Sequence, residues 1–297
     1  MRWILGFGCR RRLGLSEPTI RIQKVKKNTV RTRLIIFGTL AALLLIGSLF
    51  ADHLVPYDPY LQDLSNAKAV PSAAHLLGTD RYGRDMLSRV IVGSRMSIFG
   101  TLLLVAITTT IGTAVGIICG LHGKWLDTVL MRVSDMFLAF PGLVFALAVA
   151  GVLGGGLQNA IIALAAISWP KYARIARSQT LSQKEMTYIK AAYLAGSGTG
   201  KILFIHILPN IMGPILVTAM LDIGTMMMEL AGLSFLGLGA KPPAAEWGSM
   251  MSDTRSLLST VPWVTLSPGF AIFLSVMIFN LLGDTIRDYA DPKMRNR

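Results

Sequence analysis

Long runs of apolar residues, separated by shorter segments that hold most of the charges, dominate the pattern of this chain. The first run without a charge covers residues 34–51, and the second covers residues 96–121. A helix needs about 20 apolar residues to cross the hydrocarbon layer of a membrane, and these runs approach or exceed that length. The pattern therefore predicts a membrane protein built from spanning helices.

The third apolar run, residues 136–170, is too long for a single spanning helix. Three consecutive glycines at residues 154–156 interrupt it and predict a turn between two spans. The second of these spans must continue past Pro170 to cross the membrane. We therefore expect Lys171 and Arg174 to extend their charged ends to the membrane surface.

Two further runs complete the pattern. The fifth predicted span lies within residues 211–238, which contain only two charged residues, and the sixth lies within residues 256–283. Pro262 and Pro268 stand near the start of the last run, so we expect its helix to begin after them. The pattern predicts an all-α membrane protein with six transmembrane helices.

Composition supports a membrane location, because 53% of the 297 residues are hydrophobic and only 15% are charged. A soluble domain carries about 25% charged residues. The net charge is +13, and ten of the 29 Lys and Arg residues precede Leu34. A basic segment beside an apolar run marks the cytoplasmic side of a membrane span, so we expect no nucleic-acid partner.

The distribution of Lys and Arg also predicts the orientation, because cytoplasmic segments carry the excess. With both termini in the cytoplasm, cytoplasmic segments hold 22 of these residues and external segments hold 7. We expect a multi-pass protein of the cytoplasmic (inner) membrane, surrounded by membrane lipid. The chain then divides into a basic tail (1–33), a first span (34–51), an external loop (52–95), a five-helix core (96–283) and a cytoplasmic tail (284–297).

Asp222 and Glu229 are the two carboxylates within the fifth predicted span. Residues seven apart share one face of a helix, and a carboxylate at membrane depth faces a cavity or a partner. Both could line a pathway for a cationic or amine-bearing substrate, with Met226 beside them as a soft ligand for a metal. The alternative is structural, with the carboxylates bonded to neighbouring helices and Met226 packed in the core.

The sequence contains no recognisable catalytic, cofactor or resident metal site. The two cysteines lie far apart in unlike surroundings, and the four histidines lack the spacing of metal ligands. Residues 195–202 approach a nucleotide-binding loop, but Ala195 and Ile202 occupy positions that require Gly and Ser or Thr. We therefore expect that the chain is not an enzyme and binds no ATP.

The segment between the fourth and fifth predicted spans, residues 188–209, combines small residues with signals that end helices. We expect Gly196 to end a short helix, after which a turn leads to a second helix that stops at Pro209. Small side chains at Ala191, Ala192 and Gly196 would let the surface of another protein approach the backbone. An ordinary connecting loop is the alternative interpretation.

This loop is similar to the Glu-Ala-Ala-x-x-x-Gly-x9-Ile-x-Leu-Pro signature of importer permeases in the ATP-binding cassette class. Five residues of the signature are present: Ala191, Ala192, Gly196, Leu208 and Pro209. The chain departs from it at Lys190, where the family often has Glu, and at His206, where Ile is expected. The resemblance implies that this loop, Lys190 included, seats in a groove of an ATPase subunit and couples ATP binding to transport.

Three further motifs resemble the permeases of peptide and nickel importers: HLLGTDRYGRD at 75–85, LSFLGLG at 233–239 and NLLGD at 280–284. Trp169 and residues 221–224 look closer to the nickel members. The resemblance implies a type I importer bundle that works with a second homologous permease, two ATPase subunits and an extracytoplasmic substrate-binding protein. The substrate would be nickel, free or chelated, or a di- or oligopeptide.

Two other classes of transporter compete with this interpretation. A secondary transporter would work without ATP, but such proteins often contain internal repeats, and no convincing repeat is found here. An exporter permease of the same class would not depend on an external binding protein. The coupling signature favours the importer.

Overall fold

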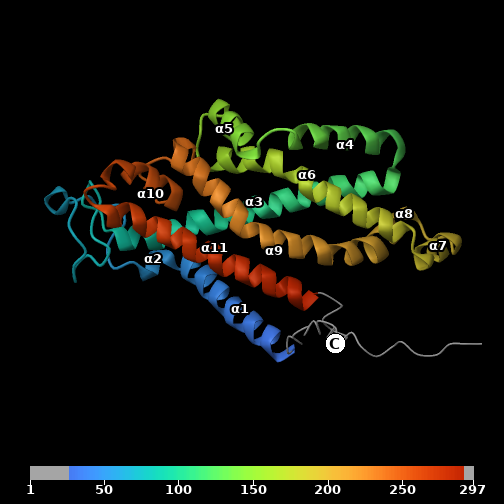
Figure 1. The fold of residues 1–297 in the computed structure, drawn as a ribbon, viewed down its shortest axis with the longest axis horizontal. Coiled ribbons are helices and arrows are strands. Elements are labelled where there is room, and N and C mark those ends of the chain that lie inside the picture. Colours follow the sequence, from blue (N-terminus) through green and yellow to red (C-terminus); the bar gives the residue numbers. More distant parts are fainter. Residues whose placement is uncertain (1–26, 291–297) are drawn as a thin grey trace, which may run out of the picture.

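The computed structural model describes residues 27–290, and within that range the chain is almost entirely helical (Figure 1). No strand occurs among these residues, and one isolated bridge pairs Thr79 with Asp85. The predicted all-α fold is therefore confirmed. Most of the predicted basic tail and the end of the C-terminal tail lie outside the described residues.

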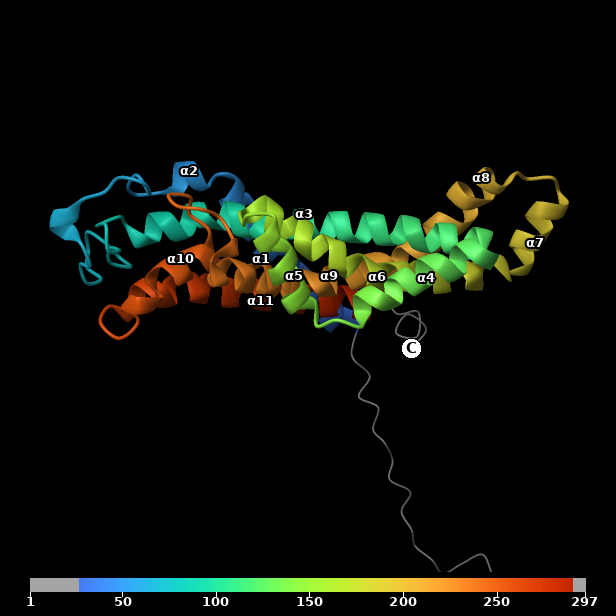
Figure 2. The same cartoon turned by 90° about the horizontal axis from the view of Figure 1, so that it is seen from above.

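Within residues 27–290, five long helices and one bent pair of helices run back and forth along the long axis of the molecule (Figures 1 and 2). They are α1 (Lys27–Leu49), α3 (Met86–His122), the pair α4 (Lys124–Leu138) and α5 (Gly142–Val152), α6 (Leu157–Lys184), α9 (Leu208–Leu233) and α11 (Pro262–Ala290). Shorter helices connect them: α2 (Ala51–Leu54), α7 (Thr187–Leu194), α8 (Thr199–Ile202) and α10 (Trp247–Thr254). This order agrees with the six passes that the hydrophobic pattern predicts.

The passes differ in how well each could cross a membrane alone. By length and hydropathy, four helical segments within residues 27–290 qualify, and the bent pair α4–α5 would make a fifth. The remaining pass, α6, is 28 residues long but carries Lys171, Arg174 and Arg177 in its sequence. α6 therefore depends on neighbouring helices to neutralise its charges.

Two predicted helix boundaries are wrong. The third predicted span is not one straight helix, because α4 ends before Ala139 and α5 begins after Pro141, with a bend of 92° between them. Proline lacks an N–H and disfavours a helical conformation in the residue before it. The last helix begins at Pro262 and contains Pro268, instead of beginning after both. Pro262 fits there because amides in the first helical turn have no intrahelical partner.

α3 and α6 approach each other along a stripe of glycines on α3. The stripe consists of Gly112, Gly116 and Gly120. A Cβ atom added at Gly112 would lie 2.5 Å from the carbonyl oxygen of Trp169, and one at Gly116 would lie 2.7 Å from the Cβ of Ala176. Small residues spaced four apart let membrane helices bring their backbones together. The stripe therefore sets the separation of the two helices.

The core lies where α3, α6 and α9 meet, and α1 stands at its edge. Ile98, Leu164 and Leu230, one from each of the three helices, have almost no exposed surface. In contrast, α1 packs mainly on α11, and large apolar side chains such as Ile36 and Leu43 remain exposed on it. An exposed apolar face on a spanning helix contacts lipid or a partner subunit.

The two ends of the bundle carry different structures (Figures 1 and 2). One end holds α10 and the segment that joins α2 to α3, whereas the opposite end holds α7 and α8. The start of α1 and the end of α11 both lie toward the end that holds α7 and α8. The candidate coupling loop and both ends of the described chain are thus on one side.

Replacing Gly116 with Ala tests the glycine stripe. The added methyl group collides with α6, and overpacking of this kind costs about 1–3 kcal/mol of folding free energy. The expected result is a lower midpoint of thermal unfolding, followed by tryptophan fluorescence of the purified protein. Gly213→Ala in α9 is the control, because nothing lies within 4 Å of a Cβ there. A Gly116→Ala variant as stable as Gly213→Ala would contradict the close contact.

Candidate functional site

The helix α7 ends in the way that the sequence predicts. Gly196 has a φ of +78°, a left-handed conformation that glycine adopts without strain. Its amide donates to the carbonyl of Tyr193, and the amide of Ser197 donates to the carbonyl of Ala192, both at 3.0 Å. These two bonds form a Schellman motif, which satisfies carbonyls that the end of a helix leaves free. The predicted role of Gly196 in ending the helix is confirmed.

The segment α7–α8 is anchored on one side and open on the other. Ile189 from α7 and Ile202 from α8 are fully buried and hold the segment against the bundle. Leu194, at the end of α7, is 90% exposed, and Ala191 is also exposed. An apolar side chain this exposed, beside small residues, is typical of a surface that another protein covers.

Lys190, where the family signature often has Glu, has a partner within its own chain. Its Nζ lies 2.8 Å from a carboxylate oxygen of Glu185. The hydrogen bond from Lys190 lowers the pKa of Glu185 below its usual range. Both side chains are well exposed, so the pair adds little stability. Lys190, in place of the Glu of the family signature, therefore forms an ion pair with Glu185, which lies just before α7.

The predicted stop at Pro209 is wrong. The chain is helical from α8 through a π-helical turn, Leu203–Ile207, directly into α9, where Pro209 occupies the first turn. A proline ring clashes with the carbonyl four residues earlier, and a π turn changes the local hydrogen-bond pattern enough to accommodate it. Leu208 and Pro209 thus belong to the start of α9, whereas Gly196 belongs to the exposed tip.

Asp222 is buried between α9 and α6. Its carboxylate accepts hydrogen bonds from Lys171 Nζ at 2.5 and 2.7 Å and from the Tyr172 hydroxyl at 2.8 Å. Lys171, which the sequence predicts to extend to the membrane surface, has a side chain that is half exposed, and the carboxylate of Asp222 holds its ammonium group. Arg174 is likewise paired, with Asp135 on α4 at 2.5 Å. A buried carboxylate needs such partners to offset the loss of water.

These contacts belong to a larger series that the sequence analysis missed. Lys171, Arg174 and Arg177 follow each other at intervals of three on α6, and each pairs with a carboxylate of another helix: Asp222 on α9, Asp135 on α4 and Asp127 on α4. The signal was present in the sequence, because α6 carries these cations without an acidic residue of its own. Unpaired charge within a span predicts acidic partners on its neighbours.

Glu229 lies two helical turns beyond Asp222 on α9, but its surroundings differ. It is partly buried, and within the described residues its carboxylate makes no hydrogen bond or ion pair. Met226, which lies between the two acidic positions, is 5% exposed and belongs to the hydrophobic core. The two carboxylates of α9 therefore differ: Asp222 is neutralised by an ion pair, whereas Glu229 has no partner among the described residues.

Arginines in the predicted external loop, residues 52–95, have acidic partners at the end of the bundle that holds α10. Asp80 accepts hydrogen bonds from the backbone amide of Arg84 at 3.0 Å and from its Nε at 2.6 Å. Arg89 approaches the same carboxylate at 4.0 Å. All three side chains are buried, and Asp85 of the same motif caps α3 through Ser88. The motif at residues 75–85 is thus a structural element in which the positive charge is offset locally.

Comparison with known proteins agrees with this architecture. The family model for the inner membrane component of binding-protein-dependent transport systems matches residues 112–296. The dipeptide transport system permease protein DppC of Alkalihalophilus pseudofirmus is 44% identical over 232 residues, which cover 78% of this chain and 76% of that protein. The nickel transport system permease protein NikC of Escherichia coli K12 is 41% identical over 266 residues, or 90% and 95%.

Two further comparisons extend the match. The glutathione transport system permease protein GsiD of Pectobacterium atrosepticum is 40% identical over 289 residues, covering 94% of this chain and 96% of that protein. An inward-facing structure of the MetNI methionine ABC transporter shares the fold, with a TM-score of 0.56 at 18% identity, over 69% of this chain and 98% of that one. The chain therefore belongs to the family of binding-protein-dependent transport system inner membrane components and is a multi-pass permease subunit of an ATP-binding cassette importer, not an enzyme.

Proposed function

We propose that this chain forms the translocation pathway of its importer together with a second, homologous permease, and that it carries nickel, free or chelated, or di- and oligopeptides. Relatives named for dipeptide, nickel and glutathione transport match it at 44%, 41% and 40% identity. These values are too similar to favour one substrate, so the proposal names the class. Family membership does not favour a secondary transporter that works without ATP.

The observation that carries the proposal is the geometry of α7–α8. The segment projects from one end of the bundle, with Leu194 and the small residues Ala191 and Gly196 on its exposed surface. We propose that two ATPase subunits bind at this end, one on this chain and one on its partner permease. ATP binding would move α7–α8, and α9 would follow because the two are joined by continuous helix.

The same proposal places this end in the cytoplasm. The start of α1 and the end of α11 lie toward α7–α8, and the cytoplasmic segments of this topology hold most of the Lys and Arg residues. The opposite end, with α10 and residues 55–85, would then face the extracytoplasmic substrate-binding protein. Alternating access would open the pathway to one end and then to the other.

Within the pathway, we propose different roles for the two carboxylates of α9. Glu229 has no partner among the described residues, so it remains able to attract a metal cation or the amino group of a peptide. Asp222 is already neutralised by Lys171, and it therefore holds α9 against α6 beside the pathway. Met226 contributes packing next to Glu229 and would contact substrate only after a rearrangement.

Replacing Gly196 with Asp tests the coupling role. A side chain is strained at a φ of +78°, and the added charge opposes docking of an apolar surface. In the reconstituted transporter, substrate-stimulated ATP hydrolysis and uptake should both fall by at least about tenfold, a change of roughly 1.4 kcal/mol. Membrane insertion should persist, because the segment lies outside the spanning helices.

Gly123→Asp is the matched control, because Gly123 also has a positive φ, of +61°, has open space around a Cβ, and joins α3 to α4 outside α7–α8. Substrate-stimulated ATP hydrolysis by this control variant should match that of the wild type. Wild-type stimulation and uptake by Gly196→Asp would disprove the assignment of α7–α8 as the coupling segment.

Replacing the carboxylates one at a time separates the two roles on α9. Glu229→Gln should reduce uptake while the complex assembles at wild-type levels, because Glu229 makes no hydrogen bond or ion pair within residues 27–290 and Gln has nearly the same size. Asp222→Asn should reduce the yield and thermal stability of the assembled complex, because Lys171 loses its counter-charge. Measuring uptake per assembled complex distinguishes the outcomes, and full uptake by Glu229→Gln would remove Glu229 from the pathway.

A further inference from the structure

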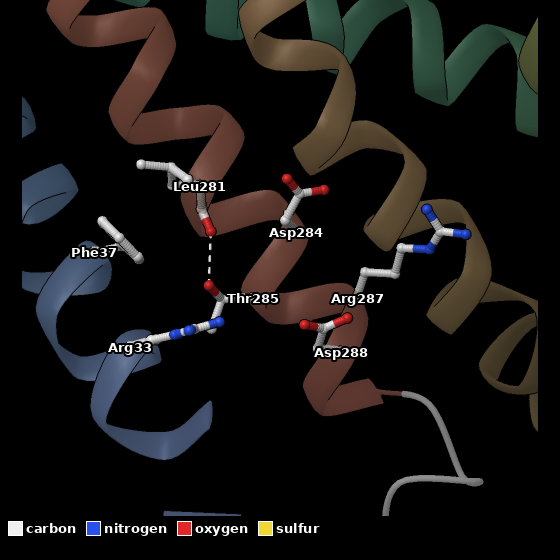
Figure 3. Close-up of a pocket in the computed structure, with 7 residues that line it drawn as sticks. All are labelled: Arg33, Phe37, Leu281, Asp284, Thr285, Arg287 and Asp288. Carbon is white, nitrogen blue, oxygen red and sulfur yellow. Dashed lines mark hydrogen bonds between the residues drawn. The ribbon is translucent and has the colours of Figure 1, made fainter. Parts of the chain in front are cut away.

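A polar pocket opens between α1 and α11, toward the end of the bundle that holds α7 and α8 (Figure 3). Its volume is about 610 Å³. The residues that line it include an arginine and a phenylalanine from α1 and a leucine and three charged residues from α11: Arg33, Phe37, Leu281, Asp284, Arg287 and Asp288. The pocket therefore combines apolar walls with four charges.

These four charges do not neutralise one another. Arg33 extends from α1 toward α11, whereas the guanidinium of Arg287 on α11 points away from Arg33 (Figure 3). All four charged side chains are exposed. Within residues 27–290, none of the four makes an ion pair or a side-chain hydrogen bond. Asp284 and Asp288 are four residues apart on a helix, where like charges repel. A cation of α1 and two carboxylates of α11, none of them paired with a described residue, suit a ligand that carries both signs.

The pocket lies where the apolar surface of the two helices ends. Phe37 and Leu40 follow Arg33 at helical spacing on α1, and Met277 and Leu281 precede Asp284 at helical spacing on α11. Leu40, Met277 and Leu281 are all exposed. In a spanning helix such residues contact acyl chains, so the adjoining charges lie at the level of lipid headgroups.

We propose that this pocket binds the headgroup of phosphatidylethanolamine, with its phosphate against Arg33 and its ammonium group against the carboxylates of α11, Asp284 and Asp288. Charge decides among the common headgroups. Pockets for anionic lipids are basic, whereas the formal charge of this lining is zero and two carboxylates would repel a second negative charge. Phosphatidylcholine carries no N–H on its ammonium group and leaves the carboxylates without donors. The acyl chains run along the exposed apolar surface of α1 and α11.

Lipid binding to the assembled transporter tests this site. The complex is purified with its partner subunits, stripped of lipid in detergent, and titrated with phosphatidylethanolamine, phosphatidylglycerol or phosphatidylcholine. Native mass spectrometry counts the lipids that remain bound. The wild type should prefer phosphatidylethanolamine, and Arg33→Gln should weaken its binding about tenfold, the effect of losing one hydrogen bond to a charged group.

A double variant, Asp284→Asn with Asp288→Asn, makes the lining basic. It should lose the preference for phosphatidylethanolamine and gain binding of phosphatidylglycerol, a gain that unfolding cannot produce. Arg132→Gln is the control, because Arg132 is an exposed arginine on α4 outside the pocket. Equal binding of the three lipids by the wild type would overturn the proposal. So would an Arg33→Gln variant that matches Arg132→Gln, or a double variant that gains no phosphatidylglycerol.

Discussion

A helix that carries three cations cannot remain within a membrane by itself, and this constraint on α6 organises the rest of the bundle. Each cation needs a carboxylate from another helix, so α4 must lie on one side of α6 and α9 on another. The glycine stripe of α3 covers a further side, where the backbones of α3 and α6 lie close together. α6 is therefore the central element, although by hydropathy it is the least typical span of the six.

The hydrophobic pattern predicted the passes because the membrane imposes it directly. A span needs a long apolar run whatever it packs against, so residues 34–51 and 96–121 could be identified without knowledge of their neighbours. Gly196 was predictable for a similar reason, since only local backbone geometry requires a glycine there. Features that depend on one residue and its near neighbours in sequence were accessible from the sequence.

Features that depend on two distant segments could not be predicted from the sequence. The partner of Lys171 lies 51 residues away on α9, and helical spacing says nothing about which carboxylate will be adjacent. The helix that continues through Pro209 depends on a π turn, which no residue in the segment signals by itself. Gly112, Gly116 and Gly120 are an intermediate case. Their spacing of four is visible in the sequence, although the helix that they contact is not.

The uninterrupted helix from α8 into α9 gives the permease a mechanical property. From residue 199 to residue 233 it has a length of about 50 Å at 1.5 Å per residue. In the proposed coupling, a loop at Pro209 would absorb a displacement of α7–α8, whereas continuous helix would carry it into α9. The π turn and Pro214 are places where this helix can bend. The Asp222–Lys171 pair fastens α9 to α6. Glu229 lies beyond this attachment as seen from α7–α8, so a displacement that starts at α7–α8 would have to pass the attachment to α6 before it reached Glu229.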